Sequence, residues 1–343
     1  MAQIPALSEI LRRALSSTAS AAVSELGEIT GATTLDEVDL LLELAEQEVE
    51  RVLAEAAIIA ARDRLGLESR TERNGLSFLV ADGKTPEELI YTQNSSVAWG
   101  LDPKLVHQGI LNANHTIAIV HDLSTVNDVP IFRLLGLRNL SSFVGEIFVR
   151  ELYKLNRERL MPNPHQDGYP DLCALTPEGK AFVEEKRGIK QMSVKEHWSP
   201  FPFGGVEIKA TCGNTPKAEV AAKLQIGESR LATLQSAEWK AHHRDTNKLI
   251  GLYWDFLCGL PTILAAFYRN DLTPADWGKI VQPKEGGGKT TSVSIMTKVG
   301  VKKMGLGWIV LPTSEEMRKP LCQKRVFDIS EENVKKVCSQ LNK

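Results

Sequence analysis

Alternation of apolar and charged residues predicts a strand near the middle of the chain. In residues 206–210 the first, third and fifth positions are apolar, whereas Glu207 and Lys209 between them are charged. Successive side chains of a strand point to opposite faces, so this pattern places a carboxylate and an ammonium on one face. Asp171 follows a proline and opens a second apolar run, residues 172–175. If these two strands pair, Asp171, Glu207 and Lys209 converge.

A helical pattern precedes the two strands. Between residues 141 and 152, apolar side chains recur at the three- and four-residue spacing of a buried helix face, at Phe143, Val144, Ile147, Phe148 and Leu152. Glu146 lies close to the edge of this apolar stripe. It is therefore a candidate for an acidic residue held beside the strands, although an ordinary surface glutamate would show the same pattern.

Patterns elsewhere predict an α/β fold with a mixed central sheet flanked by helices. A long helix is expected from about residue 35 to 65, inside an N-terminal helical subdomain of residues 1–70. Residues 71–343 are then one catalytic domain. Its further strands are expected at 76–81, 116–121, 249–257, 262–268, 291–296 and 307–311, and the polar stretch 176–200 is interpreted as an insertion.

Charge is unevenly distributed along the chain. The whole sequence has a formal net charge of −2. Residues 1–70 contain six Lys and Arg against thirteen Asp and Glu, and residues 201–343 contain twenty-one against fourteen. The formal charges of −7 and +7 favour an acidic assembly or packing element beside a basic, phosphate-contacting half. A solvated acidic helix accounts for the first value equally well.

The composition argues against disulfide-rich, zinc-binding, membrane-spanning and secreted proteins. The five cysteines are scattered without CxxC spacing, which argues against a disulfide framework and a zinc site. No apolar run approaches the roughly 18 to 20 residues that a membrane span needs. The first thirteen residues lack the basic-then-apolar order of a signal peptide. A soluble cytoplasmic protein that does not contact membranes is expected.

The three converging residues predict hydrolysis of a phosphodiester. Two carboxylates close together repel each other, and Mg²⁺, which prefers oxygen ligands, relieves that repulsion. A bound Mg²⁺ activates water and neutralises charge on a phosphoryl oxygen. Lys209 could orient that water or stabilise the phosphate. Two plainer alternatives remain, in which Asp171 caps a turn and Glu207 and Lys209 form a solvated strand face.

These residues resemble a known nuclease pattern. Pro170-Asp171 together with Glu207-Ile208-Lys209 is similar to the PD-(D/E)xK nuclease superfamily, and residues 144–151, 167–172, 205–209 and 307–311 resemble the ApaLI-like type II restriction endonucleases. The resemblance implies a restriction-endonuclease-like fold, Mg²⁺ bound by Asp171, Glu207 and Glu146, and catalysis assisted by Lys209. It also implies a homodimer that cleaves duplex DNA at a short palindrome such as GTGCAC, and a separate cognate DNA methyltransferase.

Cationic and hydroxyl side chains in the C-terminal half are candidate DNA contacts. One group comprises Lys240, His243 and Arg244, and another comprises Lys289, Thr290 and Ser292. These are the donor types used on phosphates and base edges. The second group follows a glycine run, but position 283 is a proline where a Walker phosphate loop needs glycine. A flexible loop is therefore the better interpretation of that stretch.

Two other functions are compatible with the sequence. One is a repair or recombination nuclease of the same superfamily that recognises DNA structure instead of sequence. The other is a DNA-binding protein on a nuclease fold that has no catalytic activity.

Overall fold

The computed structural model describes residues 76–80, 102–165, 168–187, 189–192, 194–214, 224–241, 246–280, 293–332 and 334. All of them belong to the unit that begins at Ser69. The predicted N-terminal helical subdomain, residues 1–70, lies outside the described residues.

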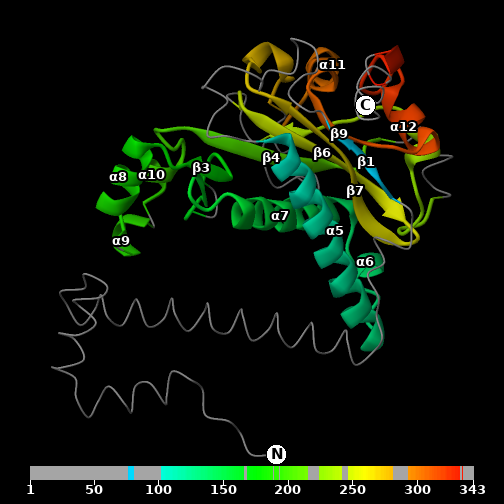
Figure 1. Cartoon of the computed structure of the whole chain (residues 1–343), viewed down its shortest axis with the longest axis horizontal. Coiled ribbons are helices and arrows are strands. Elements are labelled where there is room, and N and C mark those ends of the chain that lie inside the picture. The colour runs from blue at the N-terminus through cyan, green and yellow to red at the C-terminus, as the bar shows by residue number, and fades with distance from the viewer. Residues whose placement is uncertain are drawn as a thin grey trace, which may run out of the picture. The chain divides into compact units, whose positions relative to one another are not determined.

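A mixed sheet of seven strands forms the centre of the described part of the chain (Figure 1). β4 and β6 run parallel, and every other neighbouring pair in this sheet is antiparallel. Across the sheet the strands are β1 (Phe78–Val80), β9 (Trp308–Pro312), β7 (Leu260–Arg269), β6 (Leu249–Leu257), β4 (Gly205–Thr211), β3 (Leu172–Ala174) and β2 (Leu160–Pro162). The prediction of a mixed central sheet flanked by helices is thus confirmed at the level of the α/β class.

Helices cover both faces of the sheet (Figure 1). On one face, α5 (Pro103–Val126) and α7 (Leu137–Leu155) pack with the short α6 (Ile131–Leu134) against apolar side chains of β4, β6 and β7. On the other face lie α11 (Lys298–Leu306) and α12 (Glu315–Cys322). None of the helices that the structure describes has both the length and the apolar character to cross a bilayer.

The strand predicted at 116–121 is wrong, because these residues form the second half of α5. Their β-branched side chains suggested a strand, but strand propensity depends strongly on what a segment packs against. The buried side chains recur at helical spacing, at Val106, Ile110, Ala113, Ile117 and Ala118. Asp102 caps the helix by accepting a hydrogen bond from Lys104 N at 2.8 Å, and Pro103 occupies the first turn.

The polar segment between β3 and β4 has a small aromatic core of its own. It contains α8 (Pro177–Glu185), α9 (Ile189–Met192) and α10 (Lys195–Trp198). The rings of Trp198 and Phe201 are stacked with centroids 5.8 Å apart, and Phe182 packs edge-on to both. The predicted insertion is therefore a packed element beside the strand that follows Asp171.

Between β4 and β6 the chain crosses one face of the sheet. This segment holds η2 (Leu231–Thr233) and β5 (Lys240–Ala241), which pairs with β8 (Ser294–Ile295) in a separate two-stranded sheet. Trp239 is fully buried over β6, where Gly251 leaves room for it. Two parallel strands such as β4 and β6 can be joined only by a crossover of this kind. The path of this crossover segment determines which side chains lie beyond the end of β4.

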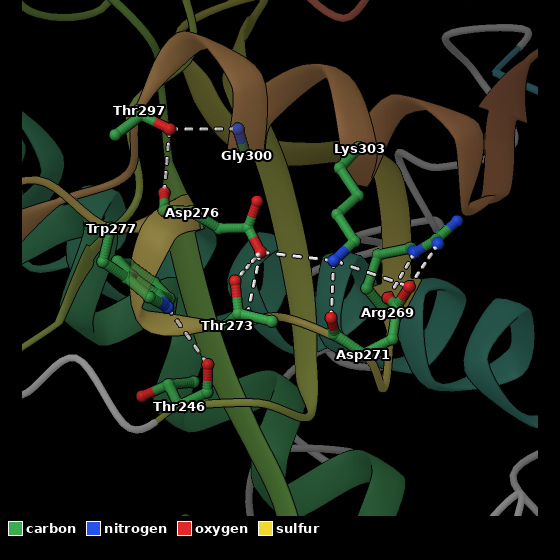
Figure 2. Close-up of polar contacts among 9 residues, drawn as sticks. All are labelled: Thr246, Arg269, Asp271, Thr273, Asp276, Trp277, Thr297, Gly300 and Lys303. Atoms are coloured by element: carbon green, nitrogen blue, oxygen red, sulfur yellow. Dashed lines mark hydrogen bonds and ion pairs between the residues drawn. The ribbon is translucent and has the colours of Figure 1, made fainter.

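A polar network fixes α11 to the end of β7 (Figure 2). Lys303 on α11 lies 3.2 Å from the buried Asp276 carboxylate, at the end of η3 (Pro274–Asp276). Thr297 caps α11 by accepting from Gly300 N at 3.1 Å, and its hydroxyl donates to Asp276 O. Since every partner within this network comes from the C-terminal half, it stabilises the face opposite α5 and α7.

Gly205 allows β3 and β4 to approach each other closely. A Cβ atom at this position would lie 2.1 Å from Leu172 O and 2.3 Å from Pro170 Cγ. Both neighbours belong to the segment that carries Asp171. A side chain at residue 205 would therefore push the two strands apart.

Gly205→Ala is expected to destabilise the protein by about 1 to 3 kcal/mol, because overpacking of a tight contact costs this much. Gly136→Ala is the matched control, since no atom lies within 4 Å of the added Cβ there. Urea unfolding of the two variants checks the prediction. Equal stabilities of the two variants would contradict it.

Candidate active site

Asp171 and Glu207 lie opposite each other at the junction of β3 and β4. In this antiparallel pair, Leu172 is opposite Val206 and Cys173 is opposite Gly205, so the next pair outward is Asp171 and Glu207. Each carboxylate binds the backbone of the other strand. Asp171 N donates to Glu207 Oε2 at 3.1 Å, and Ile208 N donates to Asp171 Oδ2 at 2.8 Å. The side chains thus replace the ladder hydrogen bonds where β3 begins.

Lys209 contacts both carboxylates. Its Nζ lies 2.5 Å from Glu207 Oε1 and 3.4 Å from Asp171 Oδ2. Val206 and Ile208 are buried on the opposite face, against α7. The structure therefore brings together the three residues that the alternating pattern predicted to converge.

The pKa values of Glu207 and Lys209 are both raised in this cluster. Burial, followed by the negative charge of Asp171, raises the pKa of Glu207 to about 7, although Lys209 acts in the other direction. Burial alone would lower the pKa of Lys209, but the charges of Glu207 and Asp171 and its hydrogen bonds to both raise it overall. Lys209 is therefore a permanent cation near neutral pH, while Glu207 is poised to lose a proton there.

Glu146 stands near this group on α7. The helix approaches β4 closely at the preceding residue, since a Cβ on Gly145 would lie 3.9 Å from Ala210 Cβ. Partial burial and then the charge of Asp171 raise the pKa of Glu146, and Lys209 lowers it. Glu146 keeps contact with solvent despite this partial burial, and the bonds that join Asp171, Glu207 and Lys209 do not include it. The charges of Asp171 and Lys209 therefore act on Glu146, although Glu146 is not part of their hydrogen-bonded cluster.

The donor set fits a hard divalent cation that retains water ligands. Two carboxylates and one ammonium give the cluster a formal charge of −1, and burial, followed by the charge of Asp171, raises the pKa of Glu207. In the described part of the chain, no three His, Cys, Asp or Glu side chains form a ready-made metal group. Mg²⁺ commonly binds through one or two carboxylates with waters and substrate phosphates. Asp171 and Glu207 would hold it, with Glu146 reached through water.

Asn163 is a functional candidate that the sequence patterns did not reveal. Its Nδ2 donates to Pro170 O at 3.0 Å and to Trp198 O at 2.8 Å. Its backbone N donates to Asp171 O at 2.9 Å. Asn163 thus ties the start of β3 to the aromatic insertion and positions Asp171. The flanking residues Pro162 and Pro164 restrict the backbone here, but nothing in the sequence identifies the groups that the amide would bind.

Of the six predicted DNA contacts, the structure describes Lys240 alone. Lys240 is exposed in β5, outside the main sheet. The other five predicted contacts lie outside the described residues, namely His243, Arg244, Lys289, Thr290 and Ser292. Their proposed contacts with DNA remain predictions.

The stability difference between the wild-type protein and Glu207→Gln is expected to depend on pH. A carboxyl group whose folded pKa is raised contributes stability that is complete below its unfolded pKa, near 4.5, and is lost as pH rises through about 7. Gln cannot titrate. In metal-free buffer, the variant should therefore gain on the order of 3 kcal/mol relative to wild type between pH 4 and pH 8.

Urea unfolding at the two pH values measures this change. Glu316→Gln is the matched control, because Glu316 is exposed on α12. Its difference from wild type should vary less with pH than that of Glu207→Gln. An equal pH dependence of the two variants would contradict the raised pKa of Glu207.

Comparison with known proteins found no relative of this chain. The chain matches no family model, no curated protein and no solved structure at a significant level. Its function is therefore inferred from the geometry of Asp171, Glu207 and Lys209.

Proposed function

We propose that this protein is a Mg²⁺-dependent endonuclease that hydrolyses phosphodiester bonds of duplex DNA. The observation that supports it is the cluster in which Asp171, Glu207 and Lys209 meet across two paired strands. An isolated acidic-x-basic triplet on a strand is uninformative. A second carboxylate held against the same ammonium by a different strand supplies two oxygen ligands for a cation beside a fixed positive charge, which suits metal-assisted phosphodiester hydrolysis.

Each residue has a defined task in this proposal. Asp171 and Glu207 bind Mg²⁺, which when present lowers the pKa of water and neutralises charge on a phosphoryl oxygen. Lys209 remains protonated, so it acts as a fixed positive charge beside the phosphate and as a hydrogen-bond donor to the attacking water, and it is unsuited to be the base. Glu146 orients water from the side of α7.

The overall reaction adds water across one P–O bond. The water oxygen bonds to phosphorus, and the bridging oxygen leaves and takes up a proton. The negative charge that develops on the phosphoryl group lies near Lys209. Asn163 keeps Asp171 in register with Glu207 during this step through its contacts to Pro170 O and Trp198 O.

Within this chemistry we favour a type II restriction endonuclease of the PD-(D/E)xK superfamily. One domain carries the whole predicted catalytic set, and the resemblance to ApaLI-like enzymes covers several of its segments. A homodimer would match the two-fold symmetry of a short palindromic site. A cognate methyltransferase would protect the host DNA.

Incubation with plasmid DNA in Mg²⁺ and, separately, in EDTA tests the proposal. Discrete fragments that appear only with Mg²⁺ are expected, and sequencing of their ends gives the recognised site. A metal-dependent smear would indicate a nuclease that recognises structure. Intact DNA in both samples, from folded protein that binds duplex, would indicate a binding protein and overturn the assignment of an enzyme.

Asp171→Asn and Glu207→Gln are expected to reduce the cleavage rate by at least about a thousandfold, because each removes a charged metal ligand. Binding of duplex DNA should be retained or tightened, since negative charge near phosphate is removed. Initial rates with saturating Mg²⁺ and gel-shift titrations in EDTA measure the two effects. The control Glu316→Gln should cleave at the wild-type rate, and wild-type cleavage by either active-site variant would refute the site.

A further inference from the structure

Asp255 holds a turn of the crossover segment against β6. Its carboxylate is fully buried and accepts hydrogen bonds from Ser229 Oγ at 2.7 Å and from the backbone N atoms of Arg230, Leu231 and Phe256 at 2.8 Å each. All of these donors are neutral. Asp255 therefore fixes the position of residue 230 through the backbone, and its oxygens are already occupied.

The Nε atom of Arg230 has no acceptor among the residues that the structure describes. Arg230 is only 8% exposed, and its Nε is enclosed and has no hydrogen-bond partner. The ion pairs among the described residues do not include Arg230, and its contact with Asp255 is made by its backbone N. A guanidinium stays charged at neutral pH, and a buried charge without a partner is strongly unfavourable. This arrangement is explained if an anion binds there.

A second enclosed donor lies in the same region. The hydroxyl of Tyr253 is buried without a hydrogen-bond partner. Burial and then the charges of Asp255 and Cys212 raise the pKa of Tyr253, whereas the charge of Arg230 lowers it. Tyr253 lies two residues before Asp255 on β6, and Asp255 binds the backbone N of Arg230, so Tyr253 and Arg230 are near neighbours. Tyr253 Oη and Arg230 Nε both lack an acceptor among the described residues.

These groups surround the end of the strand that carries Glu207 and Lys209. Cys212 directly follows β4, and its pKa is raised by burial but lowered by the positive charges of Arg230 and Lys240. Lys240 is exposed at the surface. Asn214, three residues beyond the end of β4, pairs with Ser236, so the segment that leads to Lys240 returns to this end of β4. Two cations, one enclosed and one exposed, thus lie near the end of β4.

The spacing along the sheet relates this region to the candidate active site. Lys209 pairs with Gly251 of β6, and Asp255 is four residues farther along the same strand. At roughly 3.3 Å per residue, the backbone positions of Gly251 and Asp255 are about 13 Å apart. Gly251 faces the same side of the sheet as its partner Lys209. Asp255 also faces this side, because it is an even number of residues from Gly251 along β6. DNA rises about 3.4 Å per nucleotide of a strand, so the distance corresponds to about four nucleotides.

We propose that Arg230, with Lys240 at the rim, forms a binding site for a phosphate of the DNA backbone about four nucleotides from the bond cleaved at Asp171 and Glu207. The proposal rests on the proposed function for the source of the phosphate, although the site itself requires only a tetrahedral oxyanion. Arg230 binds the phosphate oxygens through its free N–H groups, and Asp255 acts as the positioning residue.

Thermal unfolding with and without inorganic phosphate, at constant ionic strength set with NaCl, tests the oxyanion site. Phosphate should raise the melting temperature of the wild-type protein by several degrees, and it should leave Arg230→Met unchanged. Without phosphate the variant should be at least as stable as wild type, because Met keeps the aliphatic stem and removes an unpaired charge.

Arg187→Met is the matched control, since Arg187 is exposed on the surface and pairs with Glu184 at 2.8 Å. It should respond to phosphate as the wild-type protein does. A wild-type protein that does not respond, or an equal response in wild type and Arg230→Met, would overturn the site. A loss of stability by Arg230→Met that is the same in both buffers would assign the side chain a packing role only.

Duplex binding in EDTA distinguishes backbone phosphate from free phosphate. Arg230→Met and Lys240→Met should each reduce the slope of log affinity against log salt concentration by about 1, and Arg230→Lys should retain most of the slope. An unchanged slope despite a lost phosphate response would overturn the assignment to DNA. If the wild-type protein fails to cleave DNA but shows the expected phosphate response, hydrolysis is refuted while the oxyanion site stands.

Discussion

The candidate site depends on an exchange between side chains and backbone across one pair of strands. Where β3 begins, the Asp171 carboxylate accepts a hydrogen bond from Ile208 N at 2.8 Å. The Glu207 carboxylate accepts one from Asp171 N at 3.1 Å. This exchange forces two carboxylates into one small region, and Lys209 offsets their repulsion in part. Without it the two acidic residues would be free to turn to solvent, and the deficit of positive charge that favours a divalent cation would disappear.

Three other parts of the described structure hold the contact between Asp171 and Glu207 in place. α7 packs behind β4 and brings Glu146 into the field of the cluster. Asn163 and the aromatic insertion hold the residues before Asp171. The crossover after β4 returns the chain as β6, which buries Glu207 by pairing beside it. Rigid supports of this kind keep a small polar site in the geometry that catalysis requires.

Local alternation was sufficient to predict β4 and the convergence of its two charged residues with Asp171, because the period of a strand is fixed by its geometry. The same reasoning failed for residues 116–121, where β-branched side chains pack as one face of α5. It treated residues 176–200 as polar and missed the stacking of Trp198 on Phe201. Arg230 was also invisible, because its lack of a partner depends on Asp255 being saturated by neutral donors, a property of the folded arrangement.

The pairing of β1 with β9 has a consequence for how the protein is made. These strands lie at residues 78–80 and 308–312, so more than two hundred residues separate one partner from the other. During synthesis β1 leaves the ribosome early and has no strand to join until β9 follows. The pair formed by β3 and β4 is much more local, and its residues can meet long before the sheet is complete. Completion of the sheet at its β1 edge is therefore expected to follow the pairing of the strands beside the acidic residues, because a contact that is distant in sequence forms more slowly.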